Sequence, residues 1–202
     1  MDSNPWAFSR ASHIDTLNQM SSTQTMSTKA WSHWYHITGS TYGTWLPGDP
    51  RGHRTRHHRE HVDGDYKNPP PKGAGQQQYE RSQTLLKRPP VKLTPAARKL
   101  ACDTMTAAFL HHNIDLSAIA IGSTHYHILA RFPEDNPRKF TGIAKKRSAR
   151  ALSEQDHIPE GGAWALRSRS HPINDEQHLQ TARQYILRHQ SQGAAIWPNA
   201  TS

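Results

Sequence analysis

The run HYHILARF, residues 125–132, constrains the fold more than any other stretch of this chain. It follows a Gly-Ser-Thr turn and is typical of a strand. Side chains alternate along a strand, so the face with Tyr126 and Ile128 is apolar and must pack against other elements. The opposite face carries His125 and His127, roughly 6–7 Å apart at the strand rise. Two imidazoles at that spacing can converge on one metal ion, although a solvated sheet face is the commoner reason for a bare His-x-His.

The rest of the chain alternates between strand and helix patterns. Thr94 followed by Pro95 is a helix start, while Asn174 and Gly193 are suited to begin and end the last helix. The order predicts an α+β fold, a ferredoxin-like β-α-β-β-α-β antiparallel sheet with an additional C-terminal helix. The predicted strands are residues 33–41, 114–121, 125–132 and 164–168, and the predicted helices are residues 95–112, 136–155 and 174–193.

Two segments fall outside this pattern. Residues 1–30 are rich in Ser, Thr, Asn and Met without periodicity, so we expect a flexible leader ahead of one domain at 31–198. Residues 51–90 are basic and rich in His and Pro, which predicts an insertion or long loop outside the core. His57 and His61 in this insertion would form a second metal pair if they were helical, but the surrounding Gly, Pro and positive charge favour a disordered basic loop.

Charge points to the kind of partner. The sequence has 25 Lys+Arg against 16 Asp+Glu, a formal net charge of +9. Such a balance favours a polyanion, nucleic acid first and an anionic membrane surface second. Cys102 is the only cysteine, which excludes internal disulfides and suits a reducing cytosol. No stretch approaches about 18 uninterrupted apolar residues, so we expect a soluble, cytoplasmic protein that does not span a membrane.

The last predicted helix carries a second pair of chemically active side chains. Leu179, Ala182 and Ile186 recur at helical spacing and form its apolar stripe. Tyr185 lies beside that stripe, and His189 follows about 40° away and one turn on, whereas Gln190 is about 140° away. An amphipathic helix with a boundary tyrosine explains this pattern when it is taken alone. Together with the strand histidines, the Tyr/His pair predicts a common site.

These residues resemble the single-tyrosine HUH transposases, in particular the REP-associated tyrosine transposases. The resemblance rests on HYH for the histidine motif, YILRH for the tyrosine motif, the element order, the Trp-containing strand before the last helix, and YGTWLPGDPRG at residues 42–52. It covers about residues 33–197 without most of 53–90. It implies a nuclease and strand transferase that acts on single-stranded DNA, often beside a hairpin.

The resemblance also implies roles for residues. Tyr185 would be the nucleophile that forms a 5′-phosphotyrosine linkage, and His125, His127 and His189 would hold a divalent cation, Mn or Mg. Gln190 is the alternative third ligand. Because related enzymes can supply the tyrosine helix in trans, both a monomer and a homodimer stay open.

Basic and aromatic residues are candidates for contacts with DNA. A cationic helix face and the insertion would neutralise phosphates, and Trp45, Trp34 and Tyr35 could stack on unpaired bases. A solvated helix face and core packing of the aromatics are the simpler explanations. The candidate cations are Lys145, Lys146, Arg147, Arg150, Arg51, Arg54 and Arg56.

Two other functions fit the same sequence. A catalytically inactive hairpin-binding domain would keep the fold and the charge without forming a covalent adduct. An RNA-recognition module would present stacking aromatics on its sheet, where this chain has His125 and His127.

Overall fold

A computed structural model describes residues 33–54, 61–64 and 68–198. The predicted leader lies outside the described residues. The predicted order of strands and helices is confirmed, and the main elements are β1 (Trp34–Thr41), α3 (Pro95–His111), β4 (Asp115–Ile121), β5 (His125–Arg131), α4 (Pro137–Glu154), β6 (Trp164–Pro172) and α5 (Glu176–Arg188). Two 3₁₀ turns, Pro133–Asp135 and His189–Gln192, follow β5 and α5.

The main sheet has five strands in the order β6-β1-β5-β4-β7, and every neighbouring pair is antiparallel. Its first four strands have the order expected of a ferredoxin-like fold, so the α+β prediction is confirmed. β7 (Ala195–Trp197) was not predicted, and it pairs with the outer edge of β4. β6 is also longer than expected and reaches Pro172.

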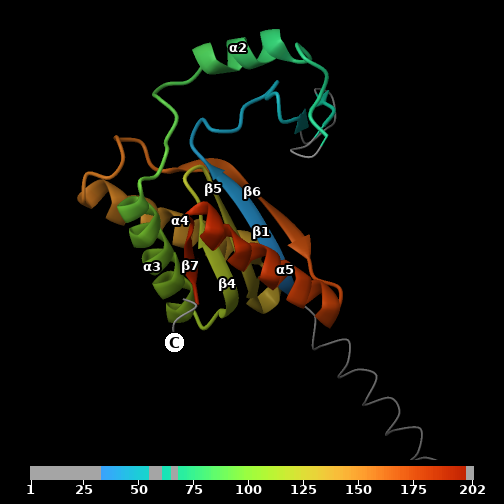
Figure 1. The fold of residues 1–202 in the computed structure, drawn as a ribbon. Coiled ribbons are helices and arrows are strands. Elements are labelled where there is room, and N and C mark those ends of the chain that lie inside the picture. The colour runs from blue at the N-terminus through green and yellow to red at the C-terminus, as the bar shows by residue number, and fades with distance from the viewer. Residues whose placement is uncertain (1–32, 55–60, 65–67, 199–202) are drawn as a thin grey trace, which may run out of the picture.

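Helices cover both faces of this sheet (Figure 1). Helices α3 and α4 pack on one face, in a core that includes Met105, Phe109, Ile128 and Leu152. Helix α5 packs on β4 and β5 from the other face, where Leu129, Ala182 and Ile186 form a smaller core. Coverage on both sides explains why β4 is a nearly continuous apolar run rather than an alternating one.

Short polar side chains fix the helix starts. The Thr94 side chain accepts a hydrogen bond from the Ala97 backbone N–H, as its position before Pro95 predicts. The N-cap of α5 is Asp175 and not Asn174, because the Asp175 carboxylate accepts the His178 N–H while Asn174 still lies in the connection from β6.

The insertion is more ordered than the sequence suggests. It contains helix α2 (Gln76–Thr84) and a two-stranded ladder of β2 (His53–Arg54) and β3 (His61–Val62), all of which stand away from the main sheet (Figure 1). No residue of 51–90 that the structure describes belongs to either hydrophobic core. His61 lies in a strand, so the helical spacing required for a His57/His61 metal pair is not met; His57 itself lies outside the described residues.

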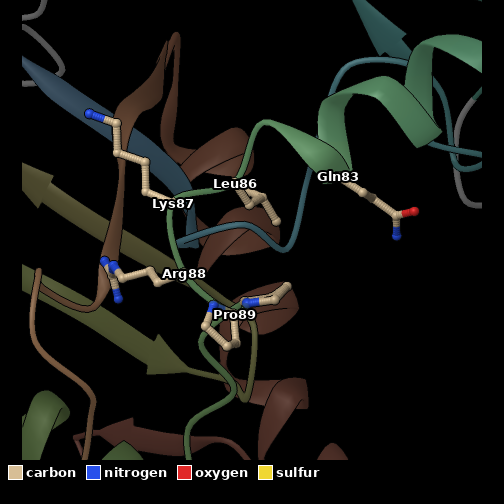
Figure 2. A pocket seen from close by; sticks show the side chains of 6 residues that line it. Gln83, Leu86, Lys87, Arg88 and Pro89 are labelled. Carbon is tan, nitrogen blue, oxygen red and sulfur yellow. The ribbon is translucent and has the colours of Figure 1, made fainter.

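An open pocket of about 410 Å³ follows α2 (Figure 2). Its side chains splay apart, and Figure 2 shows Gln83 and Arg88 pointing in opposite directions. Arg88 is already engaged, because it donates to the backbone oxygens of Gly161 and Gly162 and stacks on the Tyr42 ring. The lining residues are Gln83, Leu86, Lys87, Arg88, Pro89 and Pro90.

Tyr126, between the two histidines, is fully buried on the α3–α4 side of the sheet. Its hydroxyl lies 2.6 Å from Ser168 Oγ, and its ring packs edge-on against Trp164. The ring crosses Gly39 of β1, where an added Cβ would lie 2.4 Å from the Tyr126 hydroxyl oxygen. Burying this residue on one face presents both neighbouring histidines on the other. Among the described residues, no helix is both long and apolar enough to cross a membrane.

Candidate metal and tyrosine site

Strand β5 presents His125 and His127 on the face that α5 covers. His127 is buried and His125 is partly buried. The turn before them is fixed from β1, because Thr41 donates its backbone N–H to the Thr124 carbonyl oxygen at 2.8 Å. The two imidazole centroids are 5.2 Å apart, so the period-2 prediction for this pair is confirmed.

Helix α5 brings Tyr185 and His189 to the same place. Its apolar stripe is as predicted, with Ala182 and Ile186 buried. His189 begins the 3₁₀ turn that ends at Gly193, whose φ of 78° lets the chain turn back into β7. Since β7 is hydrogen-bonded to β4, the end of α5 that carries His189 is held against the sheet.

The three histidines form one cluster. The ligand atoms of His125, His127 and His189 all lie within 4.8 Å of one another. The ring centroids of His127 and His189 are 4.5 Å apart, and those of His125 and His189 are 5.5 Å apart. Gln190, the alternative ligand, is exposed on the adjacent position of the turn. One chain therefore brings together all three predicted histidines.

Tyr185 borders this cluster. Its ring centroid is 4.9 Å from that of His189 and 5.3 Å from that of His127, in both cases edge-on. The side chain is 39% exposed. The phenol thus reaches the histidines from one side while solvent reaches it from another.

A fourth imidazole, His36 of β1, completes the arrangement and was not predicted. His36 Nε2 and His127 Nδ1 lie 3.1 Å apart and share one hydrogen bond. The His36 ring also lies 6.0 Å from that of Tyr185. His36 stands in a predicted strand, but only the pairing of β1 with β5 makes it a neighbour of His127.

Hydrogen bonds select the nitrogen that each imidazole leaves available. His189 Nδ1 lies 3.0 Å from the Tyr185 backbone oxygen, and a carbonyl can only accept, so Nδ1 carries the proton and Nε2 keeps its lone pair. His127 engages Nδ1 with His36, which likewise leaves Nε2 for another partner. Metal-ligating histidines use their second nitrogen in this way.

Burial keeps these imidazoles neutral. Desolvation, together with the neighbouring His189, His36 and His125, lowers the pKa of His127 to about 2. Desolvation, with smaller contributions from nearby imidazoles, lowers the pKa of His36 to about 4. The pKa of His125 is lowered by desolvation, His189 and Arg51. At neutral pH these nitrogens offer lone pairs rather than charges.

Three convergent imidazoles could hold a metal ion. Imidazole suits transition metals such as Zn, Cu, Fe and Ni, whereas Mg, Ca and Mn prefer carboxylates, carbonyls and water. The donor set thus agrees with the metal site expected from the sequence.

The cationic helix of the sequence prediction is α4, which packs on the opposite face of the sheet from the histidines. Lys145 is not available there, because its ammonium donates to the carbonyl oxygens of Ala165 and Leu166, at 2.6 and 3.1 Å. Arg150 is paired with Glu154 at 2.7 Å. Lys146 and Arg147 are exposed.

The loop after β1 lies closer to the cluster. Arg51 donates two side-chain hydrogen bonds to the Asp49 carboxylate, and its guanidinium lies 4.4 Å above the Trp45 ring. Trp45 is 45% exposed and donates its indole N–H to the Gly52 oxygen. Arg54 lies in β2, and Arg56 lies outside the described residues.

The other two aromatic candidates are partly buried. Trp34 packs against the α5-side core, and Tyr35 packs against the core under α3 and α4. Core packing therefore accounts for both.

Comparisons with known proteins add a structural likeness. No protein-family model and no curated protein matches this chain. A solved structure of a REP-associated tyrosine transposase bound to a REP hairpin is similar over 80% of this chain and 68% of the other, at 11% identity and a TM-score of 0.44.

Proposed function

We propose that this chain is a metal-dependent endonuclease and strand transferase for single-stranded DNA, with Tyr185 as its nucleophile. The observation that carries the proposal is the contact between one tyrosine and a cluster of three histidines. The Tyr185 ring centroid lies 4.9 Å from that of His189 and 5.3 Å from that of His127. Solvent exposure of 39% lets a strand approach the phenol.

The chemistry follows from these groups. A phenol has a pKa of about 10 and is a weak nucleophile until its target is polarised. Held by His125, His127 and His189, a divalent cation would act as a Lewis acid toward a phosphate oxygen. Tyr185 Oη would then form a bond to phosphorus and lose its proton to water. The bond from phosphorus to the 3′ oxygen breaks, and that oxygen takes up a proton from water.

The products are a 5′-phosphotyrosine and a free 3′-OH. The new bond is again a phosphodiester, so little free energy is lost. A 3′-OH can therefore attack the linkage, release Tyr185 and join two strands. This reversibility supports strand transfer rather than simple hydrolysis.

The substrate class rests on charge and on the sequence resemblance. The net charge of +9 suits a polyanion. The expected substrate is a single strand next to a hairpin. Tyr185 and the histidines meet within one chain, so one copy suffices for cutting.

A denaturing gel tests the proposal directly. The full chain is incubated with Mn²⁺ and a labelled hairpin oligonucleotide with single-stranded flanks. We expect a denaturation-resistant adduct in the wild type and in Tyr42→Phe, and none in Tyr185→Phe or with EDTA. An adduct that persists in Tyr185→Phe defeats the assignment. Hairpin binding without metal and without any adduct would instead support the inactive binding domain.

A further inference from the structure

Strand β6 carries a positively charged residue, Arg169, on the same side of the sheet as the proposed site. The sequence motifs do not include this residue. β6 forms the sheet edge beside β1 (Figure 1). Arg169 of β6 pairs with Thr38 of β1, and Thr38 pairs in turn with His127 of β5. Residues paired across neighbouring strands point to the same face, so Arg169 and His127 share one face of the sheet.

A second set of cross-strand pairs agrees that Arg169 faces this side of the sheet. His171, two residues after Arg169, pairs with His36. His36 in turn contacts His127 on the α5 side of the sheet. Because the register from Ser168 to Pro172 is regular, Arg169 points to that side as well.

Arg169 is exposed, and its side chain makes no hydrogen bond or ion pair with any residue that the structure describes. Other arginines are already engaged: Arg51 with Asp49, Arg131 with Asp115 and Arg150 with Glu154. An uncommitted guanidinium on a strand retains its full capacity to bind a phosphate.

The covering helix leaves this side of the site open. Helix α5 packs on β4 and β5, while β6 is largely exposed from Leu166 onward. Tyr185 reaches from α5 toward β1, where its ring lies 6.0 Å from that of His36. A phosphate that meets Tyr185 therefore approaches over β1, with Arg169 one strand further out.

We infer that the exposed face of β6 and β1, with Arg169 at its edge, is the binding surface for the single strand that is presented to Tyr185. This inference rests on the proposed function and adds the path of the strand to it. Arg169 lies two strands from His127, or about 10 Å between Cα atoms. A single strand spans that distance in a few nucleotides at most. Arg169 thus holds a phosphate within a few nucleotides of the one that reacts.

The salt dependence of binding measures this contact. Each phosphate contact to a single strand adds about 0.7 to the slope of log K against log salt. Loss of one contact therefore weakens binding about fivefold at 0.1 M salt. The probe is a fluorescein-labelled oligo-dT of about 20 nucleotides, longer than the roughly 4–16 that one binding module covers.

The matched control is Arg138, which is also exposed and whose side chain forms no hydrogen bond or ion pair within the described chain, but which lies on α4 across the sheet. We expect Arg169→Ala to lower the slope by about 0.7 and weaken oligo-dT binding about fivefold. Arg169→Lys should keep the slope, and Arg138→Ala should leave both quantities unchanged.

Three kinds of result would contradict the inferred binding surface or the contact of Arg169 with DNA. Equal losses in Arg169→Ala and Arg138→Ala, or a loss in Arg138→Ala alone, overturn the surface, while a Tyr185-dependent adduct in the wild type leaves the proposed function standing. No binding of oligo-dT by the wild type also overturns the surface, and the proposed function is then decided by the Tyr185-dependent adduct alone. A single uncharged methylphosphonate within a few nucleotides of the mapped cut should weaken wild-type binding but not binding by Arg169→Ala; equal weakening of both also overturns the contact.

Discussion

Replacing His36 by Ala tests whether this imidazole holds His127 in its metal-binding orientation. His127 is buried, and its Nδ1 shares the 3.1 Å hydrogen bond with His36. Removing one partner leaves a buried polar atom unsatisfied, at a cost of about 1–3 kcal/mol. For a chain of this size, about 2 kcal/mol lowers Tm by roughly 4–8 °C.

The same substitution should weaken metal binding. A partner that orients a ligating histidine typically contributes about 10–100-fold to metal affinity. We therefore expect His36→Ala to bind Mn²⁺ at least about tenfold more weakly in isothermal titration calorimetry. His36→Gln offers an amide to Nδ1 and should recover part of the affinity.

His171→Ala is the matched control. His171 lies in β6 and pairs with His36 of β1, but its side chain is exposed. It should change neither Tm nor Mn²⁺ affinity by much. The reasoning fails if His36→Ala binds Mn²⁺ within about twofold of the wild type, or if its Tm falls no further than that of His171→Ala.

Two further predictions concern stability. Because burial lowers the pKa of His127 to about 2, the unfolded chain binds more protons below about pH 6.5, and stability must fall as pH decreases from there. Between pH 7 and 5 without metal, urea denaturation should show a loss of up to about 2 kcal/mol from this group, and an equal loss in His127→Gln would contradict this. Gly39→Ala should destabilise by about 1–3 kcal/mol, since its Cβ would lie 2.4 Å from the Tyr126 hydroxyl oxygen. Gly142→Ala, whose Cβ meets nothing within 4 Å in helix α4, should instead stabilise by about 0.5–1 kcal/mol, and thermal melts that rank the two variants otherwise would refute the packing argument.

Local periodicity predicted most of the fold. Strand alternation identified the buried side of β5, and three- and four-residue spacing identified the stripe of α5. Strand β7 was not predicted, because three residues are too few to show a periodic pattern. Its formation depends on the open edge of β4. The sequence predicted Asn174 as the N-cap of α5, whereas the structure has Asp175. Both residue types can cap a helix, and only the path of the chain from β6 decides between them.

The site was predictable where its residues are neighbours in sequence. His125 and His127 follow from alternation along a strand, and Tyr185 and His189 from one helical turn. His36 and Arg169 lie far from these motifs along the chain and become neighbours only through strand pairing. The cationic side of α4 was visible in the sequence, but which face of the sheet it would cover was not.

One row of residues, paired from strand to strand, links the end of α5, the histidine cluster and Arg169. Across the five strands, Ile196 of β7 pairs with Ala120, Ala120 with His127, His127 with Thr38, and Thr38 with Arg169. The row thus joins the strand that holds the end of α5, the central histidine and the proposed phosphate contact. Because side chains alternate with a period of two, a slip of one residue at any of these ladders would move one part to the opposite face. Register, more than any single contact, is what brings the histidines, the tyrosine and the arginine to one face of the sheet.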